Sequence, residues 1–243
     1  MKDESVRVYR DIPRAAPDLM ASLRELTVAD LHDALSPAAR AAGLLNPGMR
    51  PIVSGMRAYG QAVTAFCTPG DSLMAHCALY LARAGDVLVL SNGGVATGAL
   101  WGGYVALDAK TSGLAATIVD GPVRDVASCR ELQYPVWASS ISVSRAEKLG
   151  RGYVNLPVPC GGCLVNPGDI VVADDDGVLV FGPQTLEPLL SAVRGTLRRQ
   201  SPLRGRIMKG ERLFETQNFG ALLETHGIVI QDGHWAPKQS RAL

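Results

Sequence analysis

The chain has 243 residues, of which 47% are hydrophobic and 19% charged, with a formal net charge of +1 and 5% aromatic residues. This balance allows a substantial core and argues against binding to nucleic acid or to an anionic membrane. No secretory signal and no window of about 20 apolar residues is found, and five cysteines do not suggest a disulfide framework, so we expect a reduced, cytoplasmic protein without a membrane segment.

Hydrophobic periodicity predicts the following elements in chain order. Leucines at helical spacing predict a helix over residues 17–36 that Pro37 ends, and residues 52–66 predict strands with Gly55 and Gly60 as turn or bulge points. An alternating series then predicts a helix over about 71–83, a strand at 87–90, a helix over about 98–112 ending at Gly113, a strand at 114–119, a short helix near 125–132 and a strand from 135. This alternation indicates an α/β layered unit.

Residues 150–182 change in character, because glycines and prolines separate short apolar strands. This pattern predicts antiparallel β structure beside the α/β unit, with a hairpin turn between strands 170–173 and 178–181. From Pro183 onward the pattern is helical, and the arginines of 194–206 predict a solvated or subunit-facing surface. We therefore expect a single domain over residues 1–243, with a core over about 20–182 and a helical C-terminal extension over about 183–243.

The stretch from Ile118 to Asp125 is the most informative part of the chain. The apolar run 114–119 ends in Asp-Gly-Pro, and Arg124 and Asp125 follow at once. In an open α/β sheet the carboxyl ends of strands line the ligand crevice, and the loop Asn92-Gly93-Gly94 follows another apolar strand of the same unit. A carboxylate there can hold a hard cation, and an arginine can hold an anionic substrate. The alternative is that Asp125 only caps the following helix and Arg124 pairs with a nearby acid.

Other motifs carry weaker signals. The segment 98–105 predicts a helix start whose N–H groups can bind a carboxylate, although Gly102 and Gly103 could simply permit close packing. The Cys160–Cys163 pair lacks the second ligand pair of a zinc site, so a pair of buried small residues in a turn is expected. We interpret His76 as a core or interface histidine.

A resemblance to the RraA-like family rests on three runs: PGDSLMAHCALYLARAGDVLVLSNGG, ALWGGYVALDAKTSGLAATIVDGPVRD and VNPGDIVVADDDGVLV. It covers about residues 20–182 and, more loosely, the tail to about 225. The family holds the regulator of ribonuclease E activity A and the divalent-metal class II 4-hydroxy-4-methyl-2-oxoglutarate / 4-carboxy-4-hydroxy-2-oxoadipate aldolases. The resemblance implies an α/β fold, an α/β/β/α sandwich of the swivelling-domain type with mixed sheets, assembled as a homotrimer or homohexamer with active sites at subunit boundaries.

The resemblance also implies a set of site residues. Asp125 matches the metal ligand, and Arg124 matches the arginine placed against the reacting oxygens. Glu211 resembles the glutamate that a neighbouring subunit lends to the metal's water shell. The segment that binds the substrate carboxylate through its backbone is matched by Gly102, Gly103, Tyr104 and Val105. One position departs from the aldolases, which carry an acid, then twenty residues, then Arg-Asp, because here that acid is replaced by Gly103. Loss of such an outer acid typically costs ~10–100-fold in metal affinity or activity.

The expected activity is metal-dependent cleavage of a 4-hydroxy-2-oxo diacid to release pyruvate, with oxaloacetate decarboxylation as a side activity. A single carboxylate ligand suits Mg²⁺ or Mn²⁺, which keep several waters, and does not suit zinc. The metal would take up the charge left on the pyruvyl fragment, Arg124 would orient the C4 oxygen, and a metal-bound water or one held by Glu211 would carry the proton. Two alternatives stay open: a non-catalytic protein-binding regulator of ribonuclease E, and a related metal-dependent lyase or hydratase acting on another oxo acid.

Overall fold

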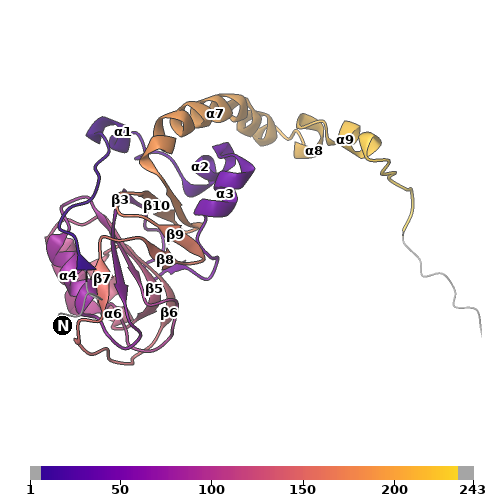
Figure 1. Ribbon diagram of the computed structural model, residues 1–243. Coiled ribbons are helices and arrows are strands. Elements are labelled where there is room, and N and C mark those ends of the chain that lie inside the picture. The colour runs from indigo at the N-terminus through magenta and orange to yellow at the C-terminus, as the bar shows by residue number, and fades with distance from the viewer. Residues whose placement is uncertain (1–6, 235–243) are drawn as a thin grey trace, which may run out of the picture. The chain divides into compact units, whose positions relative to one another are not determined.

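The computed structural model of the chain describes residues 7–234 (Figure 1). It divides into two compact units, of which the first ends at Arg194 and the second begins at Gly195. The first unit contains the layered α/β body. The second contains the later part of α7 (Leu186–Met208) and the short helices α8 (Leu213–Thr216) and α9 (Phe219–Thr225). Over the described range, no helix is both long and apolar enough to cross a membrane.

The body is built on a mixed sheet whose central strands are parallel neighbours. These strands are β3 (Ala58–Cys67), β4 (Val87–Ser91), β5 (Ala116–Val123) and β6 (Val136–Ile141). They are connected in sequence by α4 (Leu73–Leu81), α5 (Gly103–Thr111) and α6 (Val126–Leu132). At the sheet margins, β7 (Gly152–Val154) pairs with β3, β1 (Arg7–Val8) with β7, and β2 (Arg50–Pro51) with β6. Every residue of β4 is buried, which explains its continuous apolar sequence.

A second β layer starts from the first half of β3. That half pairs with β10 (Ile170–Asp174), and β10 forms a hairpin with β11 (Gly177–Phe181), as the sequence predicts. A separate small hairpin joins β8 (Val158–Cys160) and β9 (Cys163–Val165). The remaining short elements of the body are α1 (Pro17–Ala21), α2 (Val28–Ala34), α3 (Pro37–Gly43) and the 3-10 turn η1 (Pro183–Thr185).

Three apolar cores separate the layers. Leu88 and Leu90 of β4 face the core beneath α4, α5 and α6, whereas Val87 and Val89 face the core shared with β8–β11, because side chains alternate along a strand. A third core packs β10 and β11 against α2 and the first residues of α7, including Leu186. The layers therefore run helix, sheet, sheet, helix, and the predicted α/β/β/α sandwich with a helical C-terminal part is confirmed (Figure 1).

The predicted single helix over residues 17–36 is wrong, because two helices occupy this range. Thr27 starts α2 with a capping box, in which its hydroxyl accepts the Asp30 N–H and the Asp30 carboxylate accepts the Thr27 N–H. The Asp174 carboxylate accepts the next free N–H, that of Val28, at 2.9 Å. Helix α2 already ends at Ala34. Pro37 stands at the start of α3, where a proline is tolerated in the first helical turn, so it does not end the preceding helix.

Two boundaries near the predicted site also differ from the sequence analysis. Helix α5 begins only at Gly103, and residues 98–102 are not helical. Strand β5 does not end at the Asp-Gly-Pro turn but continues to Val123, because the β5–β6 register shifts between Val119 and Pro122. Both differences matter to the site, since Trp101 can then form a parallel bridge with Val123.

Candidate active site

The bridge between Trp101 and Val123 fixes the centre of the site. The Arg124 N–H donates to the Trp101 carbonyl at 3.0 Å, so Gly102 and Gly103 lie beside Arg124 and Asp125 although they are distant in sequence. At the turn from β5 into α6, Asp125 adopts φ 55° and ψ 41°. This left-handed conformation costs a non-glycine residue ~1 kcal/mol, and here the surrounding bridge and helix hold it in place.

The Asp125 carboxylate is held through one oxygen only. Its Oδ2 accepts the Gly103 N–H at 3.2 Å and lies 3.6 Å from the Arg124 Nε. It makes no capping hydrogen bond to α6, so the alternative interpretation of Asp125 as a side-chain cap is wrong. Within residues 7–234, Oδ1 has no hydrogen-bond or ion-pair partner, and the side chain is 44% exposed. One carboxylate oxygen is therefore available to a ligand.

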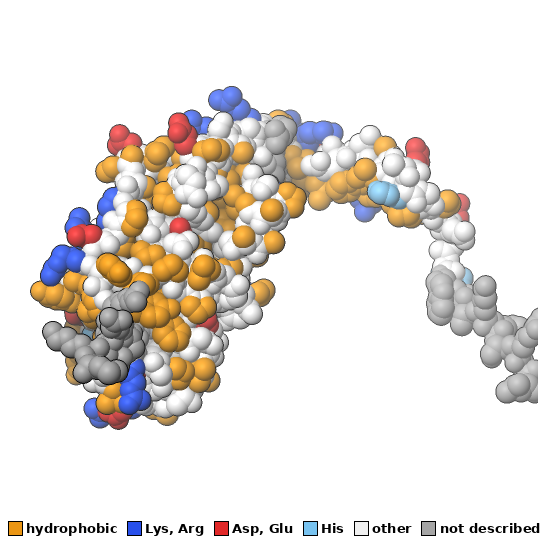
Figure 2. Space-filling model, viewed as in Figure 1, with side chains coloured by type: hydrophobic (Ala, Val, Ile, Leu, Met, Phe, Trp, Pro, Cys, Tyr) orange, Lys and Arg blue, Asp and Glu red, His pale blue; other side chains and the backbone are white. Residues whose placement is uncertain are grey.

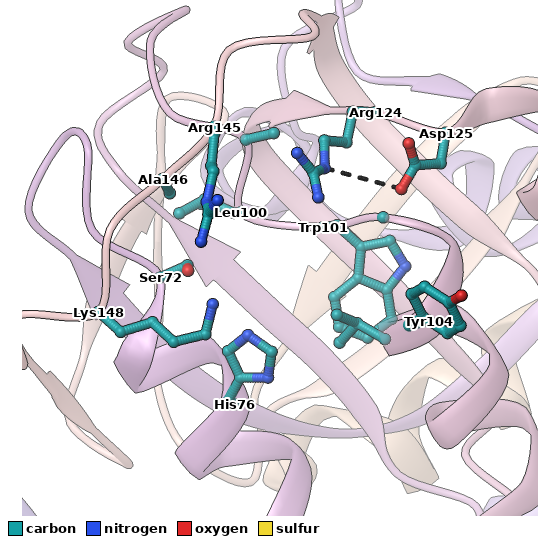
Figure 3. Close-up of a pocket in the computed structure, with 13 residues that line it drawn as sticks. Ser72, His76, Leu100, Trp101, Tyr104, Arg124, Asp125, Arg145, Ala146 and Lys148 are labelled. Atoms are coloured by element: carbon teal, nitrogen blue, oxygen red, sulfur yellow. Dashed lines mark ion pairs between the residues drawn. The ribbon is translucent and has the colours of Figure 1, made fainter.

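Arg124 and Asp125 open onto a pocket of about 320 Å³ (Figure 3). Arg145 and Lys148 extend into it from the side opposite Asp125, and His76 lies beneath Lys148 in this view. Four separate stretches of the chain contribute to the lining: Ser72 and His76; Ala99, Leu100, Trp101, Gly102, Tyr104 and Val105; Arg124 and Asp125; Arg145, Ala146 and Lys148.

The loop that carries Arg145 and Lys148 is anchored by a buried carboxylate, Asp71. Its oxygens accept the N–H groups of Leu73 at 2.8 Å, Leu149 at 3.0 Å and Arg151 at 2.9 Å. Burial by itself raises the pKa of Asp71, but these N–H donors lower that pKa below its usual value overall. The start of α4 and the cationic loop are thus fixed to one ionised side chain.

The pocket is rich in positive charge. Among its described lining residues, Asp125 is the only carboxylate, whereas Arg124, Arg145 and Lys148 are cations. Burial, with the nearby positive charge of Lys148, lowers the pKa of His76 below its usual value of 6.5, so the imidazole is mostly neutral at pH 7. The site is consequently suited to a ligand with more than one negative charge.

The donor set limits which metal could be held. In the part of the chain that the structure describes, no three His, Cys, Asp or Glu side chains gather at one point. A structural or catalytic zinc has at least three protein ligands, and residues 7–234 of one chain do not supply such a set here. A single exposed carboxylate with one free oxygen fits Mg²⁺ or Mn²⁺, which retain most of their water shell.

The residues expected to bind substrate meet in this pocket. Gly102, Tyr104 and Val105 line it together with Arg124, and Gly103 contributes its N–H to Asp125. Gly103, Tyr104 and Val105 form the first turn of α5, where the backbone N–H groups have no helical acceptor. Such N–H groups can hold a carboxylate, as the sequence predicts for this segment.

Glu211 lies in the second unit. Its carboxylate pairs there with Arg206, at 2.8 Å from Nε and 2.7 Å from Nη2. Both side chains are close to half exposed, and an exposed pair of this kind contributes little to stability. The expected role of Glu211 at the site of a neighbouring subunit stays a prediction.

The glycine-rich loop after β4 does not meet the Arg-Asp pair as the sequence analysis expects. Gly93 and Gly94 line a separate cavity of about 360 Å³ beside Asp120, whose carboxylate accepts the Gly161 N–H at 2.9 Å. The buried Asn92 amide donates to the Val95 carbonyl at 2.8 Å and shapes this loop. The loop therefore lies at a cavity other than the one beside Arg124 and Asp125.

Sequence reasoning missed three basic residues that line the pocket, namely His76, Arg145 and Lys148. His76 looked like a core residue because it lies on a mostly apolar helix, yet it is only half-buried and faces the pocket. Arg145 and Lys148 follow β6, so the rule that ligands bind beyond the carboxyl ends of parallel strands could have pointed to them.

Fold and site together define a class of protein: an α/β/β/α sandwich whose one-carboxylate, cation-rich pocket lies beyond the carboxyl ends of parallel strands. Comparison with known families gives a narrower assignment. The family model described as RraA-like, Aldolase/RraA, matches residues 28–180, and the chain belongs to the RraA-like family.

The similar proteins include one named as an aldolase and one described as a member of a ribonuclease-inhibitor family. A protein of Halalkalibacterium halodurans, named provisionally as a 4-hydroxy-4-methyl-2-oxoglutarate aldolase, is 34% identical over 69% of this chain and 78% of its own. The crystal structure of RraAS2 from Streptomyces coelicolor, described as an unusual member of the RNase ES inhibitor RraA protein family, has a TM-score of 0.72 at 28% identity, covering 80% of this chain and 99% of the other. An uncharacterised Pseudomonas syringae protein has a TM-score of 0.73 at 25% identity, covering 84% and 99%.

Proposed function

We propose that the protein is a divalent-metal-dependent lyase that cleaves a C–C bond of a 4-hydroxy-2-oxo diacid and releases pyruvate. The observation that carries this proposal is the free oxygen of Asp125 beside Arg124, at the mouth of a pocket with two further cations. The aldolase names of several relatives support a lyase of this class.

Each end of the pocket has a separate task in this proposal. The N–H groups at the start of α5 bind the carboxylate next to the 2-oxo group, and Asp125 holds Mg²⁺ or Mn²⁺. Arg145 and Lys148 bind the second carboxylate at the opposite end. A monoanion such as pyruvate would leave this cationic end without a partner, which is why a diacid is the better match.

Arg124 lies between the two ends and is close enough to serve the reacting atoms. Its Nε is turned toward Asp125, and its remaining guanidinium N–H groups have no acceptor in residues 7–234. They are available to orient the C4 oxygen and to stabilise charge on it as the bond between C3 and C4 breaks. When bound, the ion supplies Lewis-acid stabilisation of the negative charge that develops on the pyruvyl fragment, worth several kcal/mol.

Oxaloacetate decarboxylation is proposed as a side activity, because it leaves negative charge on the same pyruvyl fragment. The proton carrier is a water, held by Glu211 of a neighbouring subunit in a homotrimer or homohexamer. In such a ring of subunits, residues of two neighbouring chains would together form each pocket. This part of the proposal rests on the family resemblance of Glu211.

The test is a coupled assay of pyruvate release from 4-hydroxy-4-methyl-2-oxoglutarate and from oxaloacetate. Activity is expected with Mg²⁺ or Mn²⁺, is expected to stop on addition of EDTA, and is expected to be absent in Asp125→Ala. Asp108→Ala, which removes an exposed carboxylate of α5 outside the pocket lining, is the matched control. Turnover that survives EDTA, or full activity in Asp125→Ala, would contradict the proposal.

A non-catalytic regulator of a ribonuclease is the second candidate, and its support is the fold similarity to the RNase ES inhibitor family. A binder has no chemical need for a free carboxylate oxygen beside an arginine. A pull-down with ribonuclease E separates the two candidates: capture of the nuclease by both the native chain and Asp125→Ala, without pyruvate release, would favour the regulator.

A further inference from the structure

The side chain that Gly103 lacks would point at a specific neighbour. A Cβ atom built on Gly103 would lie 3.0 Å from the Cβ of Ser128, 3.4 Å from its Oγ and 3.5 Å from the Cβ of Asp125. A contact of 3.0 Å between two Cβ atoms is tighter than most Cβ contacts in proteins, so the neighbour would have to shift by a few tenths of an ångström. Since Ser128 lies on the rigid helix α6, any larger residue at position 103 and the serine compete for one space.

Ser128 is also placed next to the proposed metal ligand. The Cβ atoms of Ser128 and Asp125 would lie 3.0 Å and 3.5 Å from the same Gly103 Cβ position, so the two side chains start close to each other. The side chain is exposed, and its hydroxyl makes no hydrogen bond within the described residues. A hydroxyl both donates and accepts, so it can hold a water in either orientation.

We infer that Ser128 is a positioning residue for the water shell of the divalent ion, and that it takes over the task for which this chain has no acid at position 103. Waters of a Mg²⁺ shell lie ~2.1 Å from the ion. A hydrogen bond adds ~2.8 Å. A hydroxyl oxygen within roughly 5 Å of an ion on Asp125 would therefore be close enough to orient one of the ion's waters. The inference rests on the proposed metal site, but not on the identity of the substrate.

The closeness of positions 103 and 128 leads to two expected effects of substitutions there. If the hydroxyl orients a metal-bound water, its removal weakens metal binding in the absence of any substrate. If the serine occupies the place of an acid, an aspartate at position 103 should be tolerated only when Ser128 has been reduced to glycine. The second effect follows from the close contact alone, whereas the first is not expected of a serine that is merely part of a solvated helix surface.

The experiment measures Mn²⁺ dissociation constants by electron paramagnetic resonance for the full chain and five variants, one of which is Asp125→Ala. Ser128→Ala is expected to weaken Mn²⁺ binding by ~10-fold, within the usual range for outer-sphere groups. Gly103→Asp alone should bind Mn²⁺ no better than the native chain and melt at a lower temperature, whereas Gly103→Asp/Ser128→Gly should bind at least as tightly as the native chain. Ser112→Ala, which removes an exposed hydroxyl at the other end of α5, is the matched control and should have no effect.

Unchanged Mn²⁺ affinity in Ser128→Ala overturns the inference, while loss of binding in Asp125→Ala alongside it keeps the proposed metal site. Weakened binding in Ser128→Ala, in a protein that releases no pyruvate from any oxo acid tried, supports the inference and overturns the proposed function. A native chain that binds no Mn²⁺ overturns both.

Discussion

Gly102 is a position where the space, and not the backbone conformation, requires a glycine. Its φ of −168° is extended and open to any residue, but a Cβ there would lie 2.8 Å from the Asp125 Oδ2 and 3.3 Å from the Arg124 Cγ. We predict that Gly102→Ala displaces both side chains and lowers kcat/KM by on the order of 100-fold, since a misplacement of ~1 Å can have that effect. Steady-state pyruvate release measures it.

The matched control for this substitution is Gly205→Ala. Gly205 is helical, and a Cβ there would meet no atom within 4 Å. Activity in this variant should equal that of the native chain. Native activity in Gly102→Ala as well would show that the close approach of Gly102 to Asp125 has no bearing on the reaction.

Lys148 affects both the ligand and its neighbour His76, which allows a second prediction at this scale. Lys148→Met keeps most of the aliphatic stem and removes the charge. The KM for a diacid should rise by ~10-fold or more, whereas the affinity for pyruvate should change little, because only the diacid reaches the cationic end. The same substitution should raise the pKa of His76, because burial and Lys148 both lower it in the native chain.

NMR titration of the imidazole together with substrate kinetics checks this prediction, and Lys110→Met is a control with an exposed lysine outside the pocket lining. If the KM for the diacid rose and the affinity for pyruvate fell by the same factor, the result would argue against a second carboxylate site. An unmoved His76 pKa would show that the two side chains do not interact in solution.

At the scale of elements, Asp71 links the start of α4 to the loop that carries the pocket cations. It is 2% exposed and accepts three backbone N–H groups. Asp71→Asn replaces an acceptor oxygen by a donor and leaves at least one of these N–H groups unpaired, at a cost of about 1–3 kcal/mol in the free energy of unfolding. Urea unfolding at pH 7 measures the loss.

The acid dependence of stability should change in the same variant. Because the folded pKa of Asp71 is lowered, its stabilising contribution is present above the unfolded value of ~3.9 and is lost as pH falls through the folded pKa. Asp71→Asn should therefore lose less stability than the native chain as the pH falls below about 4, the usual pKa of an aspartate. Parallel acid unfolding curves for the two proteins would contradict this account.

An element could be predicted where its pattern lies within a short stretch of sequence, and not where it depends on contacts between distant residues. Strand β4 and the β10–β11 hairpin follow from apolar runs and turn residues alone, as does the position of Arg124 and Asp125 after β5. The continuation of β5 to Val123 depends on a register shift against β6, which periodicity does not reveal. The loop with Arg145 and Lys148 is fixed by Asp71 hydrogen bonds across 78 and 80 residues of sequence. Periodicity does not reveal such long-range contacts, and only the position of the loop after β6 points to the pocket.

At the scale of the molecule, the second unit leaves many apolar side chains exposed. Helices α8 and α9 bury none of their residues, and Figure 2 shows hydrophobic side chains along these C-terminal helices. Leu213 is 48% exposed, Phe214 42% and Leu222 51%. Exposed apolar surface of this kind is typical of an interaction site, and the proposed homotrimer or homohexamer would cover it.

The proposed sharing of sites between subunits can be tested by mixing two inactive variants. Asp125→Ala removes the metal ligand from one chain, and Glu211→Ala removes the expected contribution of its neighbour; Glu211 is exposed, so its loss should not unfold the chain. When the two are unfolded together and refolded as mixed oligomers, a site is intact only where a chain with Asp125 meets a neighbour with Glu211. In a ring of randomly mixed chains this occurs at about a quarter of the sites, so about a quarter of native activity should return.

Each variant refolded alone should stay inactive, and sedimentation should show the same oligomer in every sample. Mixed oligomers without activity would place both residues at one chain's own site. A Glu211→Ala chain with native activity on its own would remove Glu211 from the reaction.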